Sequence, residues 1–149
     1  MTLSALVPAV AAGLVGDAVV LAGEPDESIT KVADAAGANL VVSGEGWRAG
    51  VQAARRDWLL CLEDGDIPQE GWIRVLDRFV SLNPSECGVA RLRRPGGVLR
   101  TGLDALSAVV GRSSIRAGDL VHRRILMNET RTRSPVRLAA TIGRDPAFG

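Results

Sequence analysis

Short apolar segments alternate with amphipathic ones over residues 18–82, and this alternation is the strongest constraint on the fold. The apolar segments are rich in Val and Leu, which is typical of strands that are buried on both faces. In the segments between them, apolar residues recur at helical spacing. The predicted strands are 18–22, 39–43 and 58–62, and the predicted helices are 26–36, 47–56 and 70–82. Such βαβ units predict an α/β fold with a mainly parallel sheet flanked by helices.

The remaining segments complete a single domain that spans residues 1–149. With 149 residues, 46% of them apolar and 23% charged, the chain is long enough to bury one core. A first helix is predicted over residues 3–15, with a break at Pro8 where a second part restarts. Further elements are predicted as strands at 88–93, 118–125 and 136–142, and as a helix at 103–110.

Cysteine content and the N-terminal segment indicate a cytoplasmic protein. Cys61 and Cys87 are too few for a disulfide framework or a zinc site. The apolar segment 3–16 lacks the positively charged leading region of a signal peptide. It is also shorter than the ~20 residues that a membrane-spanning helix needs.

Charge is divided unevenly along the chain. Residues 1–86 carry 6 basic and 13 acidic side chains (net −7), whereas residues 87–149 carry 12 basic and 4 acidic ones (net +8). The division is consistent with a solvated Arg-rich face, with pairing between the halves, or with an anionic partner such as a phosphate-bearing ligand or a membrane surface. Nucleic acid is not expected, because no aromatic residues interleave with the arginines.

Three loops follow the carboxyl ends of the predicted parallel strands, where ligands bind in sheets of this kind. The first two loops contain Glu24 and Asp26, and then Gly44 and Gly46, which we predict to be cofactor-binding residues. The glycines would let the backbone of the second loop approach a phosphate, although these residues are equally consistent with a plain turn.

The third loop carries three carboxylates, Glu63, Asp64 and Asp66, within four residues. Such a cluster is tolerated when it is solvated or neutralised by a cation. A divalent metal shared with a diphosphate is one solution, and an acidic turn that caps the following helix is the other. The metal hypothesis makes these three residues the predicted ligands.

The segment WLLCLEDGDIPQEGW, residues 58–72, resembles the pattern W-L-L-F-L-D-A-D-x-x-P-x-x-W of family 2 glycosyltransferases. The strand at 17–23, the helix and strand at 29–42 and the loop at 44–50 resemble segments that precede it in that family, so the resemblance covers about residues 3–80. It implies a GT-A fold and a nucleotide-sugar donor. It also implies Mg²⁺ or Mn²⁺ on the donor diphosphate and a carboxylate that deprotonates the acceptor.

The sequence departs from the family pattern in several places. Glu63 and Gly65 stand at the metal-motif positions, so the D-x-D is displaced by one residue. Ala22 replaces the nucleoside-binding aspartate, and no late acidic pair identifies a catalytic base, so the catalytic residues are unknown. The family's first strand, which lies in the middle of its sheet, is absent. We therefore expect unpaired strand edges that a homodimer or a swapped oligomer fills.

Two functions follow from these features. The first is a metal-dependent glycosyltransferase that uses a nucleotide-sugar donor. The second is a degenerate, non-catalytic relative that acts as a binding or oligomerisation domain.

Overall fold

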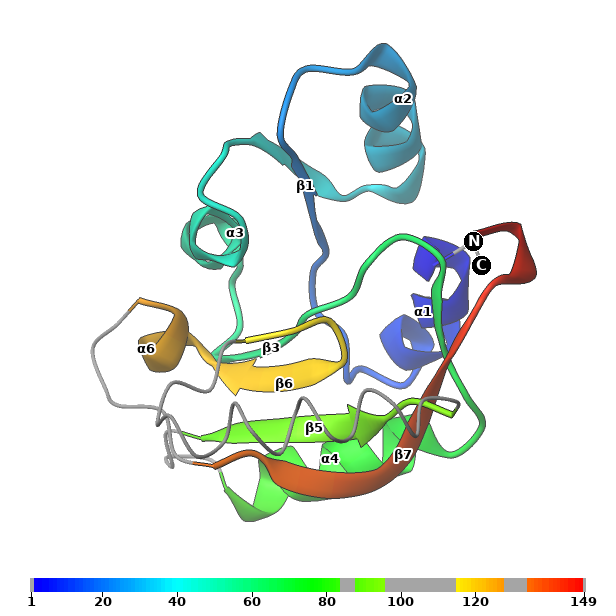
Figure 1. Ribbon diagram of the computed structural model, residues 1–149, viewed down its shortest axis with the longest axis vertical. Helices are drawn as coiled ribbons and strands as arrows, with labels where there is room; N and C mark the ends of the chain where they lie inside the picture. Colours follow the sequence, from blue (N-terminus) through cyan, green and yellow to red (C-terminus); the bar gives the residue numbers. More distant parts are fainter. Residues whose placement is uncertain (1, 84–87, 96–114, 128–133, 149) are drawn as a thin grey trace.

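The computed structural model describes residues 2–83, 88–95, 115–127 and 134–148, and it has a mixed α/β fold. The predicted helix at 103–110 lies outside these residues. The described part contains two sheets, one of two strands and one of five (Figure 1). None of its helices is long and apolar enough to cross a membrane.

The two-stranded sheet is the first predicted βαβ unit. Strand β1 (Val19–Ala22) pairs in parallel with β2 (Asn39–Val42), and helix α2 (Glu27–Ala36) connects them. Asp26 begins the helix because its carboxylate accepts hydrogen bonds from the amides of Ser28 and Ile29. Gly37 ends the helix in the left-handed conformation, with φ of 65°.

The five-stranded sheet is mostly antiparallel, so the expected mainly parallel sheet is not confirmed. Its strand order is β3–β6–β5–β7–β4, and only β5 and β7 are parallel neighbours. The physical reason is that β3 pairs with β6, a strand from the second half of the chain, instead of lying beside β1. These strands are β3 (Trp58–Leu60), β4 (Asp66–Pro68), β5 (Val89–Arg93), β6 (Asp119–His122) and β7 (Val136–Arg144).

Helices cover both faces of this sheet. On one face, α1 (Thr2–Ala11) and α4 (Trp72–Leu82) pack around a core that includes Leu76, Leu120 and Ile142. On the other face, α3 (Trp47–Ala53) and the short α6 (Arg123–Leu126) contribute to a core with Cys61 and Val121. The chain ends in a 3₁₀ turn, η1 (Pro146–Phe148).

Helix α1 runs without interruption through Pro8, and the predicted two-part helix is wrong in this detail. The missing amide of Pro8 would have bonded to the carbonyl of Ser4. Because Ser4 is exposed, water can hydrate that carbonyl, so the proline is tolerated. No strand precedes β1 among residues 2–18.

Four strand edges are left open in the described part of the chain. β3 and β4 end the five-stranded sheet, and β1 and β2 pair only with each other, so each of these four strands has one side without a neighbouring strand. In Figure 1, β1 leads upward from the region of β3 into the N-terminal unit, and the two sheets are separate.

Candidate functional site

The acidic loop between β3 and β4 separates its three carboxylates. Asp66 has no exposed surface, whereas Glu63 and Asp64 are exposed. Gly65 makes this possible, since its φ of 83° turns the chain so that Asp66 enters β4 and points inward. The amide of Glu63 then donates to Oδ2 of Asp66 at 2.9 Å. The expected three-residue ligand set therefore does not converge.

Arg94 holds the buried Asp66 carboxylate. Its two terminal nitrogens donate to Oδ1 and Oδ2 at 2.8 and 2.7 Å, which is a bidentate pair. The Arg94 side chain is 31% exposed, so the pair lies at the boundary between core and solvent. Charge-assisted bonds of this geometry are among the strongest in proteins.

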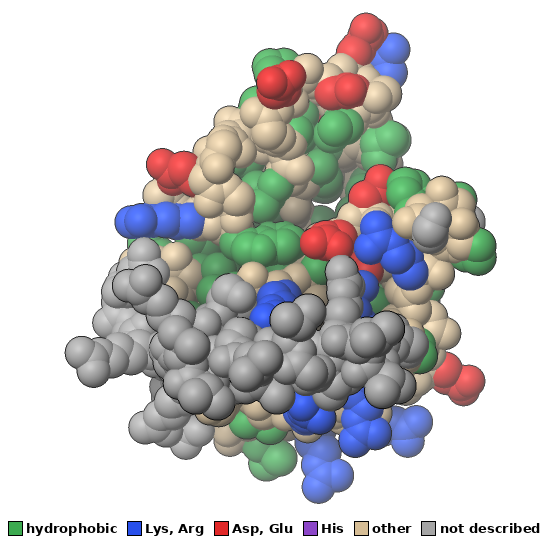
Figure 2. All heavy atoms as spheres, viewed as in Figure 1, with side chains coloured by type: hydrophobic (Ala, Val, Ile, Leu, Met, Phe, Trp, Pro, Cys, Tyr) green, Lys and Arg blue, Asp and Glu red, His purple; other side chains and the backbone are tan. Residues whose placement is uncertain are grey.

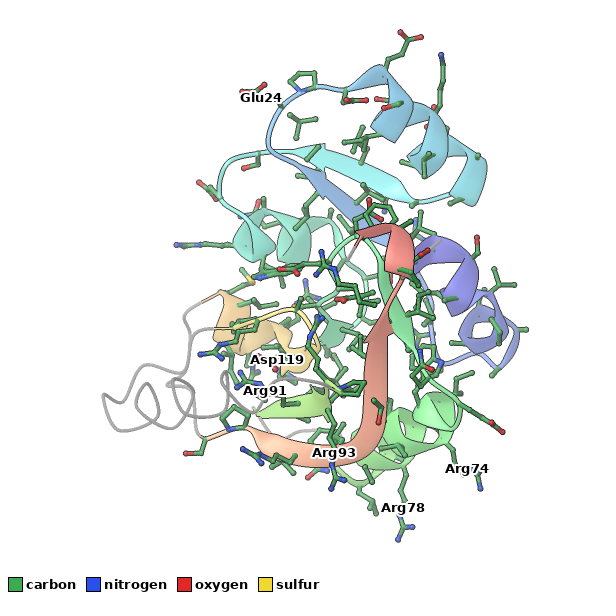
Figure 3. All side chains as sticks on the ribbon, turned by 45° about the vertical axis from the view of Figure 1, so that its right-hand side comes forward. Glu24, Arg74, Arg78, Arg91, Arg93 and Asp119 are labelled. Carbon is green, nitrogen blue, oxygen red and sulfur yellow. The ribbon has the colours of Figure 1, made fainter. Side chains whose placement is uncertain are left out.

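A second bidentate pair lies three residues earlier on β5. Nε and a terminal nitrogen of Arg91 donate to the two oxygens of Asp119 at 2.6 and 2.9 Å, and the amide of Arg116 donates to the same carboxylate at 3.0 Å. Arg91 and Asp119 are register partners on neighbouring strands, and Figure 3 shows them side by side. Nearby, burial and the negative charge of Asp119 raise the pKa of the Cys61 thiol to about 12.

The C-terminal segment covers the acidic loop. The amide of Asp145 donates to the carbonyl of Gly65 at 2.8 Å, and the amide of Gly65 donates to the hydroxyl of Thr2 at 3.0 Å. Arg144 lies 3.6 Å from the carboxylate of Glu63. The loop is thus enclosed between the start of α1 and the end of the chain.

The predicted cofactor-binding residues lie in the N-terminal unit, away from the acidic loop. Asp26 serves as the helix cap described above, and the Ser28 hydroxyl and two amides lower the pKa of its carboxyl. Gly44 and Gly46 are exposed, with open space where a side chain would be. Glu24 points outward at the top of the molecule (Figure 3). These loops do not form one site with Glu63, Asp64 and Asp66, because β3 is not part of the β1–β2 sheet.

The donor set does not fit a divalent metal. Both oxygens of Asp66 are occupied by Arg94, whose positive charge would repel a metal ion at the same carboxylate. Within the described ranges, no group of three or more His, Cys, Asp or Glu side chains is placed to hold a metal ion. Mg²⁺ or Mn²⁺ stays a prediction of the resemblance.

Part of the charge division along the sequence is explained by pairing between the two halves. Among the described residues, arginines of the second half pair with acids of the first in Arg94–Asp66, Arg123–Asp57 and Arg144–Glu63. In Figure 2, acidic side chains lie mostly in the upper part and Lys and Arg mostly along the lower part. Exposed arginines at that lower end include Arg74, Arg78 and Arg93 (Figure 3).

Sequence reasoning did not find the two buried Arg–Asp pairs. Each joins residues 28 positions apart, so no local pattern marks them. The only available signal was the cluster of Arg91, Arg93 and Arg94 at the end of the predicted strand 88–93, within the Arg-rich half for which a solvated face or a phosphate-bearing ligand was expected. Two of these arginines bind carboxylates instead.

Comparison of the chain with models of known protein families, with curated proteins and with solved structures finds no match.

Proposed function

We propose that the chain is a non-catalytic relative of family 2 glycosyltransferases, with a truncated GT-A-like fold, and that it acts as a binding or oligomerisation domain. Its partner is a second copy of the chain. The observation that carries this proposal is the break between β1 and β3, which leaves each of these two strands with an open edge, beside the outer edges of β2 and β4 in the described residues.

The order of elements supports a truncated GT-A-like fold. Strand β1, helix α2, strand β2, helix α3, strand β3 and the acidic loop follow one another as the resemblance implies. The segment before β1 forms helix α1 instead of a strand. A GT-A fold without its first strand would lack the strand between β1 and β3, and each of these two strands has an open edge.

The bonding pattern of the edges supports strand pairing with another chain. Asp57 and Cys61 bond across to β6, so the intervening Trp58 and Leu60 direct their backbone groups to the open side. At the two ends of β1, the carbonyls of Ala18 and Ala22 accept hydrogen bonds from the amides of Asn39 and Ser43, on the β2 side. By the same alternation, Val19 and Leu21 of β1 face outward. Strand edges without a neighbouring strand can recruit further strands.

The state of the acidic loop supports the non-catalytic half of the proposal. Asp66 is bound by Arg94, and the exposed Glu63 and Asp64 lie apart from it, with Arg144 3.6 Å from the Glu63 carboxylate. The alternative, the transferase hypothesis, requires the protein to bind a nucleotide-sugar donor and a divalent metal. Calorimetric titration of the protein with Mn²⁺ and UDP or GDP tests that hypothesis, and we expect no binding. Specific binding that is lost in Asp66→Ala would contradict the non-catalytic assignment.

Light scattering coupled to size-exclusion chromatography tests the oligomer. We expect the mass to rise toward twice that of the chain with increasing concentration. Val19→Pro removes an outward amide at the first position of β1, where no bond to β2 is lost. This variant should remain folded and monomeric, and the matched control Val19→Thr, which keeps the amide, should still dimerise. A wild-type protein that stays monomeric at all concentrations would refute the assembly role.

A further inference from the structure

The acidic loop contains a positive charge that comes from elsewhere in the chain. A carboxylate without exposed surface must be neutralised, because the desolvation of a single buried ion costs several kcal/mol. Asp66 meets this requirement through three hydrogen bonds, two from Arg94 and one from the amide of Glu63. Only Arg94 supplies charge.

Strand pairing does not explain why Arg94 lies beside Asp66. In the sheet order β5–β7–β4, strand β7 separates the end of β5, where Arg94 lies, from Asp66 in β4. The guanidinium therefore reaches past β7 to the acidic loop. The Arg91–Asp119 pair differs in this respect, since its residues are direct register partners on adjacent strands.

We propose that the Arg94 guanidinium is the resident cation of the acidic loop and takes the place in which the D-x-D spacing predicts a divalent metal. The protein therefore keeps this loop folded without any metal ion. This inference does not depend on the oligomeric state, so a monomeric protein would leave it intact.

The experiment measures the thermal unfolding midpoint, Tm, in EDTA and in millimolar Mg²⁺ or Mn²⁺ at constant ionic strength. Wild-type Tm should not change between these buffers. Arg94→Ala should lower Tm by roughly 10 °C, because it leaves a buried carboxylate without a counter-ion. Adding methylguanidinium or Mn²⁺ should recover part of this loss, since either supplies the missing charge. The control for the added ions is the wild type under the same conditions.

Two further variants separate charge from packing. Arg94→Ala combined with Asp66→Asn removes both charges, so its Tm should lie above that of Arg94→Ala and should not respond to cations. Arg94→Lys keeps the charge but loses the bidentate geometry, so its Tm should fall between those of wild type and Arg94→Ala. This variant also tests the proposal if Arg94→Ala does not fold.

Three results would overturn the inference. The first is a rise in wild-type Tm in Mg²⁺ or Mn²⁺, which would show that the native loop still takes a metal. The second is an Arg94→Ala protein whose loss of stability neither cation reduces. The third is an Arg94→Lys protein that is as unstable as Arg94→Ala, because the positive charge would then not be what the loop requires.

Discussion

At the residue scale, two buried carboxylates in the sheet are neutralised by arginines. Asp66 and Asp119 have no exposed surface, and both oxygens of each carboxylate accept charge-assisted bonds from arginine. Each arginine comes from β5 or its end, so this strand neutralises two places in the sheet. The partners of each pair are 28 residues apart in the sequence. Periodic patterns in a single sequence report local structure only, so they cannot reveal such pairs.

Asp119→Ala should destabilise the protein by about 3 kcal/mol, since the change removes the buried carboxylate that accepts charge-assisted bonds from Arg91 and a bond from the amide of Arg116. Urea unfolding followed by circular dichroism measures the effect. The control is Asp77→Ala on the exposed side of α4, where a change below about 0.5 kcal/mol is expected. Equal effects in the two variants would show that the buried pair contributes nothing specific.

The Cys61 thiol should be unreactive in the folded protein. Burial and the charge of Asp119 raise its pKa to about 12, so almost no thiolate exists near pH 8. In a Cys87→Ser variant, which leaves Cys61 as the only thiol, a disulfide reagent should react fully in denaturant and negligibly without it. Rapid reaction under native conditions would contradict this placement of Cys61.

Asp26 should make the protein sensitive to acid. Its pKa is lowered from 3.8 in the folded state, so its contribution to stability is present above that value and is lost as pH falls through the lower, folded pKa. The difference in unfolding free energy between wild type and Asp26→Ala should be constant above roughly pH 5 and should shrink below pH 3.8. A difference that is independent of pH would remove the helix-cap explanation.

At the element scale, the sequence predicts the local structure better than the pairing of the strands. The helices and strands between β1 and α4 lie where the alternation of apolar patterns puts them, with ends displaced by a few residues. Strand β4 lies in a segment that the sequence predicts to be a loop. Three residues are too few to show a strand periodicity, and the partner strand, β7, comes about 75 residues later. Antiparallel pairing of β3 with β6 is equally non-local, and this is why the expected mainly parallel sheet is not confirmed.

Substitution of Gly65 tests whether the C-terminal turn packs on the acidic loop. Its φ is 83°, and an added Cβ would lie 2.7 Å from Cβ of Phe148. Gly71 has a φ of 85° and open space around it, so it is a matched control for backbone strain alone. Gly71→Ala should cost about 1 kcal/mol and Gly65→Ala roughly 2–3 kcal/mol. Adding Phe148→Gly, which removes that Cβ and the ring beyond it, should recover part of the second loss. Equal costs at the two glycines would mean that the C-terminal turn does not cover the loop.

At the scale of the whole molecule, two features characterise the described part of the chain. Arginines of the basic half neutralise acids of the acidic half, including the one carboxylate of the D-x-D spacing that is buried. The two sheets are separate in the described part of the chain, and each has two open strand edges. The first feature could not be read from residue counts alone, whereas unpaired edges were expected from the resemblance, which implies a further strand.

Amide hydrogen exchange tests the central claim most directly, because it reports on the open edges themselves. The amides of Val19, Leu21, Trp58 and Leu60 face outward, whereas those of Leu59 and Cys61 face β6. If a second copy pairs with these edges, protection of the outward amides should rise with protein concentration, and protection of the inward amides should stay constant. Outward amides whose exchange does not depend on concentration would contradict an assembly domain.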